Sequence, residues 1–307
     1  MKRPLFIASA ALGLLIISYA GHRLNRRQAT PAPVASPSPV FPERVISMAP
    51  SLTETLFALG LESRLVGVTR YCKYPDEAQS KPQIGGFLDP NYEAIAALKP
   101  DLILTFPEHG ALREKLGGSG CAFLTVKHKT PEDILASIGA LGQRCGAEEA
   151  GKELVADIRA ALERINSLLE GAPAVRALIV VDRTLGAGKV DKAYIAGADG
   201  YFSRLVQLAG GANAYEGDVA FPCVSAEGIL SMNPDVVIEV IASLEERGLT
   251  VDAVTKDWEP LGDVGAVKAK RVHVFSESFA SLPGPRFHLL LEALARALHP
   301  EADWNAP

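Results

Sequence analysis

The sequence lacks the short motifs that identify most enzyme families. It has no Gly-x-Ser-x-Gly nucleophile elbow, no phosphate-binding loop ending in Gly-Lys-Ser or Gly-Lys-Thr, and no His-Glu-x-x-His zinc motif. Gly186 and Gly188 are two residues apart, but the third glycine of a dinucleotide-binding fingerprint is missing. We therefore expect no catalytic residues, no cofactor and no covalent chemistry. A transferase or dehydrogenase with nucleotide-binding-like domains stays open as an alternative, which a thermal shift with common nucleotides would reveal.

Metal-binding and disulfide patterns are missing as well. The histidines are scattered, and no two stand at metal-ligand spacing on one element; His109 or His128 with nearby carboxylates is the only candidate set. We expect no metal site. Cys121 and Cys145 fall in the same half of the chain and could pair, but spacing alone leaves this open. The four cysteines match no zinc pattern: Cys72, Cys121, Cys145 and Cys223.

Basic residues are too few for a nucleic-acid-binding surface. The chain has 31 lysines and arginines against 36 aspartates and glutamates, and five of the basic residues fall in the first 27 positions, which contain no acid. The rest of the chain is therefore clearly acidic. We expect no nucleic-acid partner, because such a partner requires a basic patch.

The N-terminus has the pattern of an export signal. Lys2 and Arg3 precede an apolar run over residues 5–19, and small residues at positions 18 and 20 suit a signal peptidase. Three arginines follow directly and resist translocation. Residues 1–27 are therefore a signal peptide or an N-terminal membrane anchor, with residues 4–20 as the anchoring segment. Either way we expect a periplasmic or extracytoplasmic protein, in which the Pro/Ala/Ser-rich residues 28–42 form a linker.

Proline is absent from residues 147–170, which contain a single glycine. Strong helix formers dominate this stretch, its apolar residues recur at helical spacing, and Glu148 and Lys152 form a favourable i,i+4 pair. A helix of this length would span roughly 36 Å. It is either a bridge between two lobes or a long crossover helix within one domain.

Strands and helices alternate on both sides of this helix. Before it, the pattern predicts strands at residues 44–48, 65–68, 101–105 and 123–126 and helices at 51–59, 90–98, 111–116 and 131–141, with Ser51 and Glu54 as a capping box. After it, strands at 177–181 and 271–275 and helices at 201–208 and 287–298 are expected. This alternation predicts α/β lobes with parallel sheets covered on both faces. The expected boundaries are 43–146 for the N-terminal lobe, 147–171 for the bridging helix and 172–307 for the C-terminal lobe.

The two halves also repeat each other in sequence. Residues 93–104 (EAIAALKPDLIL) align without gaps on residues 227–238 (EGILSMNPDVVI). Both read as a helix, a Pro-Asp turn and a buried strand. Matching segments at equivalent places of two similar halves favour an internal duplication and hence the bridge.

Aromatic residues gather in loops that follow the predicted strands. In α/β folds such loops form the binding crevice, and aromatic faces there suit a large, flat, partly apolar ligand. Any single one of them could equally be a core or turn residue. The set comprises Tyr71, Tyr74, Phe87, Phe106, Phe221 and Phe279.

Five segments, together covering much of residues 43–300, resemble one family of transport proteins. They are RVISMAPSLTETLFALG (44–60), VGVTRYCKYP (66–75), GGFLDPNYEAIAALKPDLIL (85–104), FPCVSAEGILSMNPDVVI (221–238) and RVHVFSESFASLPGPRFHLLLEALARALHP (271–300). In this order they strongly resemble the cobalamin-binding proteins of ABC importers. That family lies within the wider class of binding proteins for cobalamin, haem and siderophores.

The resemblance implies two Rossmann-like lobes joined by a single long α-helix, with ligand held between them. It implies that Glu93 and Glu227 dock onto arginines of a membrane permease; acids that merely complement helix dipoles are the alternative. Arg286 is expected to hold its loop rather than the ligand. The ligand-binding residues it implies are Tyr71, Phe87, Phe106, Phe221, Ser278 and Phe279.

Ligand identity is the least determined part of this expectation. Phenylalanine stands at several positions where the best-known bacterial members have tryptophan, so the indole donor is lost. We expect a monomer that captures cobalamin or a related corrinoid and delivers it to an ABC permease. Cobinamide, haem or a ferric siderophore are the alternatives, and a membrane-anchored ligand sensor is the alternative of another class.

Overall fold

The computed structural model describes residues 41–242 and 244–305. The N-terminal lobe contains a four-stranded, all-parallel sheet in the order β2-β1-β3-β4. Its strands are almost wholly apolar, as expected for a sheet covered on both faces. They are β1 (Val45–Ser47), β2 (Leu65–Val68), β3 (Leu102–Thr105) and β4 (Ala122–Thr125), and the helices are α2 (Pro50–Ala58), α3 (Tyr92–Ala97), α4 (Gly110–Leu116) and α5 (Pro131–Cys145).

The C-terminal lobe is built on a six-stranded sheet in the order β10-β9-β5-β6-β8, with β7 also paired to β5. Strands β7, β5, β9 and β10 run parallel, whereas β6 is antiparallel to both β5 and β8. The strands are β5 (Val175–Arg183), β6 (Lys192–Ile195), β7 (Gly211–Asn213), β8 (Cys223–Ser225), β9 (Val236–Val240) and β10 (Val272–Phe275). The helices are α7 (Phe202–Leu208), α8 (Ala226–Met232), α9 (Val251–Lys256), α10 (Gly265–Lys268) and α11 (Phe287–Leu298).

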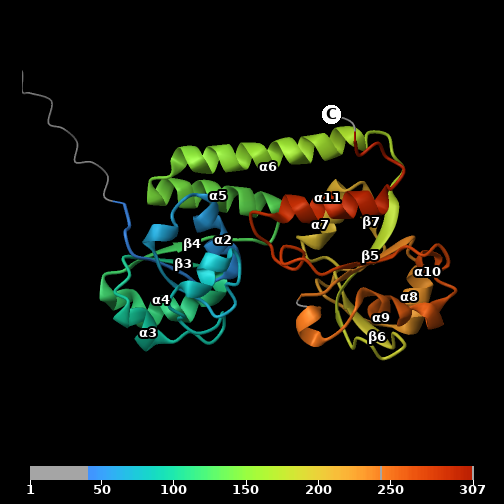
Figure 1. The fold of residues 1–307 in the computed structure, drawn as a ribbon, viewed down its shortest axis with the longest axis horizontal. Helices are drawn as coiled ribbons and strands as arrows, with labels where there is room; N and C mark the ends of the chain where they lie inside the picture. The colour runs from blue at the N-terminus through green and yellow to red at the C-terminus, as the bar shows by residue number, and fades with distance from the viewer. Residues whose placement is uncertain (1–40, 243, 306–307) are drawn as a thin grey trace, which may run out of the picture. The chain divides into compact units, whose positions relative to one another are not determined.

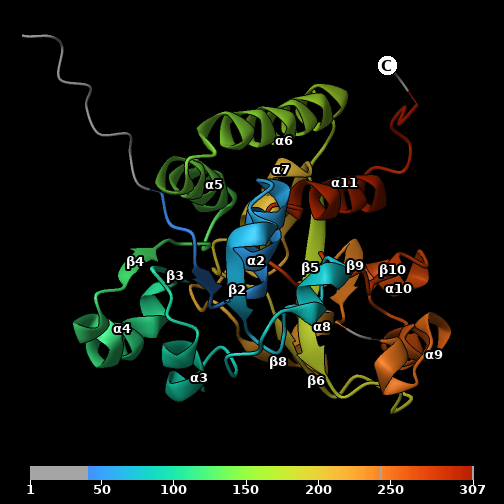
Figure 2. The same ribbon diagram turned by 60° about the vertical axis from the view of Figure 1, so that its left-hand side comes forward.

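One long helix, α6 (Glu148–Leu168), joins the two lobes, as the sequence predicted. It lies against α5 of the first lobe and α11 of the second (Figures 1 and 2). The expected pair forms at its start, with 3.0 Å between Lys152 and Glu148. Arg164 near its other end pairs with Glu292 of α11 at 3.0 Å. The helix therefore has side-chain contacts to both lobes.

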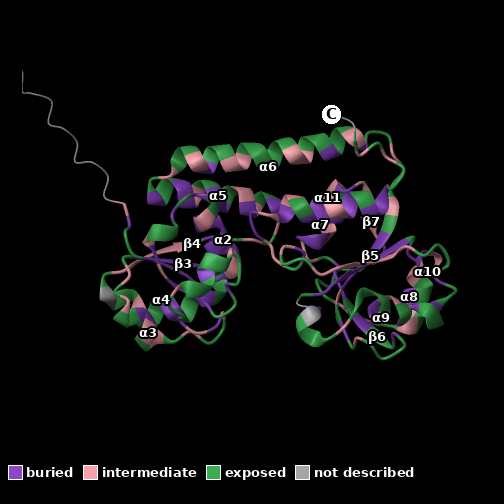
Figure 3. Cartoon of the chain, viewed as in Figure 1, coloured by how far each residue is buried: buried purple, intermediate pink, exposed green. Residues whose placement is uncertain are grey.

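A continuous hydrophobic cluster explains why this connection is firm. It includes Leu102 of the first lobe, Ile158 and Ile165 of α6, and Phe287 of the second lobe. Figure 3 shows the consequence: much of α6 is exposed, while the strands below are buried. Each fully buried isoleucine contributes roughly 1.5–3 kcal/mol. The lobes thus share one core instead of hanging on a loose linker.

The predicted internal repeat is confirmed in the backbone. Lys99 and Asn233, at equivalent places before the two Pro-Asp turns, have positive φ angles of 46° and 41°. Asp101 then accepts hydrogen bonds from the backbone nitrogens of Glu43 and Arg44 at 2.8 and 3.0 Å. Asp235 likewise accepts one from the backbone nitrogen of Arg176 at 3.0 Å. Each Pro-Asp turn therefore ties the start of one strand to its neighbour.

Three details of the expected fold are wrong. Helix α2 begins at Pro50 with Ala49 as N-cap, so Ser51 and Glu54 form no capping box. Proline is favoured in the first turn because its missing N–H has no partner there anyway. Helix α5 runs four residues beyond its expected end, to Cys145, where Gly146 turns with a φ of 72°. The second sheet is mixed, because it includes the antiparallel strand β6, which the sequence pattern does not predict.

The predicted signal or anchor segment, including residues 4–20, and nearly all of the linker lie outside the described residues. Within the ranges that are described, we find no helix with the length and apolarity needed to cross a bilayer.

Candidate functional site

A cavity of about 790 Å³ opens where the two lobes face each other, and we call it the interlobe cavity. Its walls come from helix α2 and from segments that follow β2, β9 and β10. Ligands in open α/β sheets bind at this carboxyl edge of the strands. The lining residues are Pro50, Glu54, Tyr71, Lys73 and Tyr74 from the first lobe, and Ala242, Glu246, Arg247, Ser276, Ser278, Ser281 and Leu282 from the second.

A charged pair across the lobes supports one wall of the cavity. Arg286 donates two hydrogen bonds to Glu54, at 2.8 and 2.6 Å, and its guanidinium stacks 3.6 Å from the centre of the Tyr74 ring. Burial raises the pKa of Glu54, and the adjacent Arg286 opposes that rise. The prediction that Arg286 holds its loop is supported, because Glu54 engages two nitrogens of its guanidinium.

A histidine makes a second connection between the lobes. The Nδ1 atom of His128 lies 2.8 Å from the carbonyl oxygen of Pro283 and 3.1 Å from the Ser51 hydroxyl, and Nε2 lies 2.6 Å from the Ser137 hydroxyl. Since a carbonyl only accepts, Nδ1 carries the proton and donates to Pro283. Burial lowers the pKa of His128 to about 4.

This histidine makes stability depend on pH. The unfolded chain binds a proton near pH 6.5, whereas the folded protein resists protonation until about pH 4. As pH falls from 6.5 to 4, the unfolded state therefore binds more protons and folding weakens, by up to about 3 kcal/mol from this group. We would measure the free energy of unfolding by urea at several pH values. Between pH 6.5 and 4, this free energy should fall less steeply with decreasing pH in His128→Gln than in the wild type. Identical slopes would contradict the assignment.

Two of the six predicted ligand-binding residues line the interlobe cavity. Tyr71 is 52% exposed on the first lobe, and Ser278 faces it from the second. Phe87 and Phe106 instead pack together in the first lobe, with ring centres 6.1 Å apart. Phe279 lies half-buried near Arg286, and Phe221 is 49% exposed outside the cavity lining. A ligand role for these four phenylalanines stays a prediction.

Several cavity residues have no clear signal in the sequence. Glu54 reads locally as a capping-box residue, and Tyr74 as one loop aromatic among several. Lys73 stands between two aromatic residues in TRYCKYP, which is a signal that could have indicated it. Arg247 follows a polar segment without motif, so only the fold brings it to the cavity.

The candidate metal ligands and the cysteines form neither a metal site nor a disulfide within the described residues. Both ring nitrogens of His109 are engaged, with the Phe106 backbone nitrogen and the Phe87 carbonyl, each at 3.0 Å. Over the described ranges, no group of three or more His, Cys, Asp or Glu side chains could hold a metal ion. The open pairing of Cys121 with Cys145 is not formed, and all four cysteines are free thiols.

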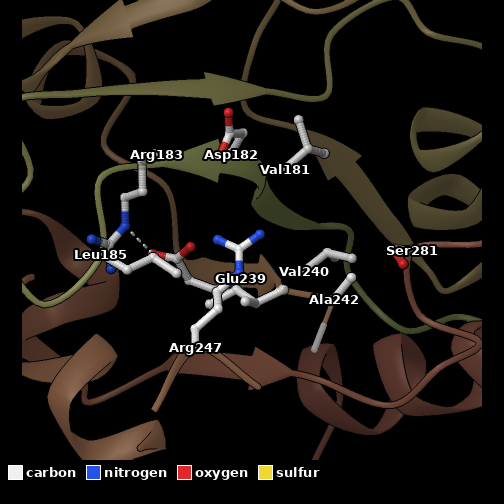
Figure 4. Close-up of a pocket in the computed structure, with 10 residues that line it drawn as sticks. Val181, Asp182, Arg183, Leu185, Glu239, Val240, Ala242, Arg247 and Ser281 are labelled. Atoms are coloured by element: carbon white, nitrogen blue, oxygen red, sulfur yellow. Dashed lines mark hydrogen bonds and ion pairs between the residues drawn. The ribbon is translucent and has the colours of Figure 1, made fainter. Parts of the chain in front are cut away.

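A smaller cavity of about 110 Å³ lies in the C-terminal lobe and shares Ala242, Arg247 and Ser281 with the larger one. Figure 4 shows its floor, where Arg183 contacts Glu239. Arg183 donates to Glu239 and to Asp257, each at 2.6 Å, and all three side chains are 1% exposed. Asp257 also accepts hydrogen bonds from the backbone nitrogens of Gly186 and Gly188, which lie in the loop after β5. This network fixes the loop beside the cavities.

The two predicted docking glutamates occupy equivalent positions on the two lobes. Glu93 lies in the first turn of α3, which Asn91 caps, and Glu227 lies in the first turn of α8, which Ser225 caps. Both glutamates are exposed. A hydrogen bond from Ser225 lowers the pKa of Glu227. In both views α3 and α8 lie on the side away from α6 (Figures 1 and 2).

Comparison with known protein families decides the class of this fold. Residues 45–277 match the family described as periplasmic binding protein. The chain belongs to that family. Periplasmic binding proteins are binding components of transport and not a class of enzymes, and they act outside the cytoplasm.

This periplasmic binding protein is similar to vitamin B12-binding and heme-binding proteins. It is 29% identical over 261 residues to the vitamin B12-binding protein of Vibrio cholerae serotype O1, covering 84% of this chain and 88% of the relative. The solved vitamin B12-binding protein BtuF of Vibrio cholerae superposes with a TM-score of 0.70 at 27% identity, over 85% of this chain and 98% of that one. The periplasmic heme-binding protein BhuT, in complex with two hemes, superposes with a TM-score of 0.71 at 27% identity, over 83% and 97%.

Proposed function

We propose that this chain is the substrate-binding protein of an ABC importer that captures cobalamin or a related corrinoid in the interlobe cavity. The carrying observation is a cavity of about 790 Å³ with one wall on each lobe, in a chain similar to a vitamin B12-binding protein. Such a volume falls within the range of pockets that hold drug-sized ligands. The protein acts as a monomer, binds reversibly and does not turn its ligand over.

Haem is the second candidate, favoured by the likeness to a heme-binding structure. Isothermal titration of the folded protein with cobalamin, cobinamide, haem and a ferric hydroxamate tests the proposal. We expect saturable binding of cobalamin with one site per chain and an unchanged ligand on release. Tight binding of haem alone would replace the corrinoid, and the absence of binding to all four would refute this function.

Tyr71 provides the main aromatic surface toward the ligand. A corrin or porphyrin ring stacked on it would lose that contact in Tyr71→Ala, which should weaken binding by about 1–3 kcal/mol, or roughly 5-fold to 150-fold in Kd. Tyr194→Ala is the matched control, since Tyr194 is 46% exposed and lies outside the cavity lining. Equal affinities for both variants would remove Tyr71 from the site.

Delivery requires a second surface that contacts the permease. Glu93 and Glu227 are exposed carboxylates at equivalent helix starts, one on each lobe. Two such charges can straddle a two-fold symmetric partner bearing arginines. Exposed ion pairs contribute only about 0.2–1 kcal/mol each, so they orient the complex without preventing its release.

A further inference from the structure

We propose that the interlobe cavity recognises a negatively charged group of its ligand, through Arg247 on one lobe and Lys73 on the other. This inference rests on the proposed function and names the ligand chemistry that the site selects. A carboxylate and a phosphate share the relevant chemistry, namely oxygens that accept hydrogen bonds while carrying charge.

Arg247 is an unengaged cation of the cavity. It lies after β9, is exposed, and lines both the large and the small cavity. Figure 4 draws no bond from its guanidinium to the nearby Asp182 or Glu239, and its side chain makes no hydrogen bond or ion pair with any residue that the structure describes. A guanidinium offers five donors in a planar fork that matches carboxylate and phosphate oxygens. The side chain thus presents an unused anion-binding group to the cavity.

Two acidic side chains near the cavity floor already have a cationic partner, although Arg183 serves both Glu239 and Asp257. Glu54 is held by two hydrogen bonds from Arg286, and Glu239 by Arg183. Asp182 is exposed at the small cavity but forms no ion pair with Arg247. Arg247 forms no ion pair with these carboxylates, so a ligand can bind it without displacing one of them.

Lys73 faces Arg247's segment from the other lobe and is only loosely engaged. Its ammonium lies 2.7 Å from Glu246, with side chains that are 59% and 64% exposed. An exposed pair of this kind contributes at most about 1 kcal/mol, so an anionic ligand group can replace Glu246 as the partner of Lys73. Lys73 and Arg247 therefore line the same cavity from opposite lobes.

Charge and hydroxyl groups around the cavity suit the same ligand. The second lobe adds three serine hydroxyls to the lining, at positions 276, 278 and 281. The charged residues of the lining are Glu54, Glu246, Lys73 and Arg247. Arg286 pairs with Glu54, so including it gives the interlobe cavity one more cation than anion. The chain as a whole is acidic, with 36 acidic against 31 basic residues. A local positive site inside an acidic protein offsets the repulsion that an anionic ligand would otherwise meet.

Two matched ligand pairs test this inference. Cobalamin carries one phosphate in its nucleotide loop and cobinamide carries none; haem carries two propionates and its dimethyl ester none. We would titrate all four into the wild type, Arg247→Gln, Lys73→Gln and the control Arg159→Gln, an exposed arginine on α6. Arg247→Gln should weaken binding of the charged member of the bound pair about 10-fold to 100-fold and the uncharged member less than about 2-fold. Lys73→Gln should act in the same direction, and added salt should weaken only the charged member.

The outcomes separate this inference from the proposed function. If the wild type binds cobalamin or haem but Arg247→Gln reduces both members of the pair equally, or neither, the anion site is refuted and the transport function stands. If the wild type binds none of the four, the function fails and the anion site with it. A selective loss for cobalamin places the recognised group in the nucleotide loop, where the phosphate is the anionic group, and a selective loss for haem identifies the propionates.

Discussion

Replacing Glu93 and Glu227 together by lysine is expected to abolish import while leaving ligand affinity unchanged. Both carboxylates are exposed, one in the first turn of α3 and one in the first turn of α8, and neither lines the interlobe cavity. Charge reversal turns attraction for permease arginines into repulsion on both lobes at once. The measurement is uptake of labelled ligand into proteoliposomes that contain the cognate permease, alongside calorimetric titration of the same variant.

Glu153→Lys with Glu163→Lys is the matched control for this experiment. Both residues are exposed and belong to α6, a helix that lies on the side away from α3 and α8 (Figures 1 and 2), and the change in net charge is the same. The control should import at the wild-type rate. Import by the Glu93/Glu227 double variant, or a large loss of its ligand affinity, would assign these glutamates another role.

Removing Arg183 should strongly destabilise the folded protein. Its side chain is 1% exposed and pairs with both Glu239 and Asp257 at 2.6 Å, while a further bond of 3.1 Å reaches the carbonyl oxygen of Val254. Arg183→Met leaves two buried carboxylates without their cation. Breaking a buried pair in this way costs about 3–5 kcal/mol, to be measured by equilibrium urea unfolding.

A neighbour on the same strand gives the comparison. Arg176 also lies in β5 but is exposed, so Arg176→Met should change the free energy of unfolding by less than about 1 kcal/mol. If the two variants lose equal stability, the buried network contributes no more than a surface arginine. Such a result would also argue against its role in fixing the loop at Gly186 and Gly188.

The sequence was sufficient for most of the architecture because its signals are local. Short apolar runs that alternate with helical stretches predicted the parallel strands, and the proline-free stretch predicted α6. The pair of Pro-Asp turns predicted the repeat, which Lys99 and Asn233 confirm through their shared left-handed backbone. By contrast, β6 is only four residues long and exposes Lys192 and Tyr194, so it has no apolar run from which to predict it.

Contacts between distant residues account for what the sequence could not predict at the site. Glu54 has a local interpretation as a capping residue, but it binds Arg286, which is 232 positions away. Arg183 and Glu239 are 56 positions apart, and no local pattern pairs them. Tyr71 lines the cavity because it closely follows a strand. The phenylalanines at 87 and 106 also follow predicted turns or strands, yet ring packing with His109 turns them into their own lobe.

Amide hydrogen exchange with and without cobalamin tests most directly whether a ligand sits between the lobes. We expect slower exchange in two segments together, residues 69–75 of the first lobe and residues 276–282 of the second, because both contribute walls of the same cavity. Protection confined to one lobe, or found only outside these segments, would contradict binding between the lobes.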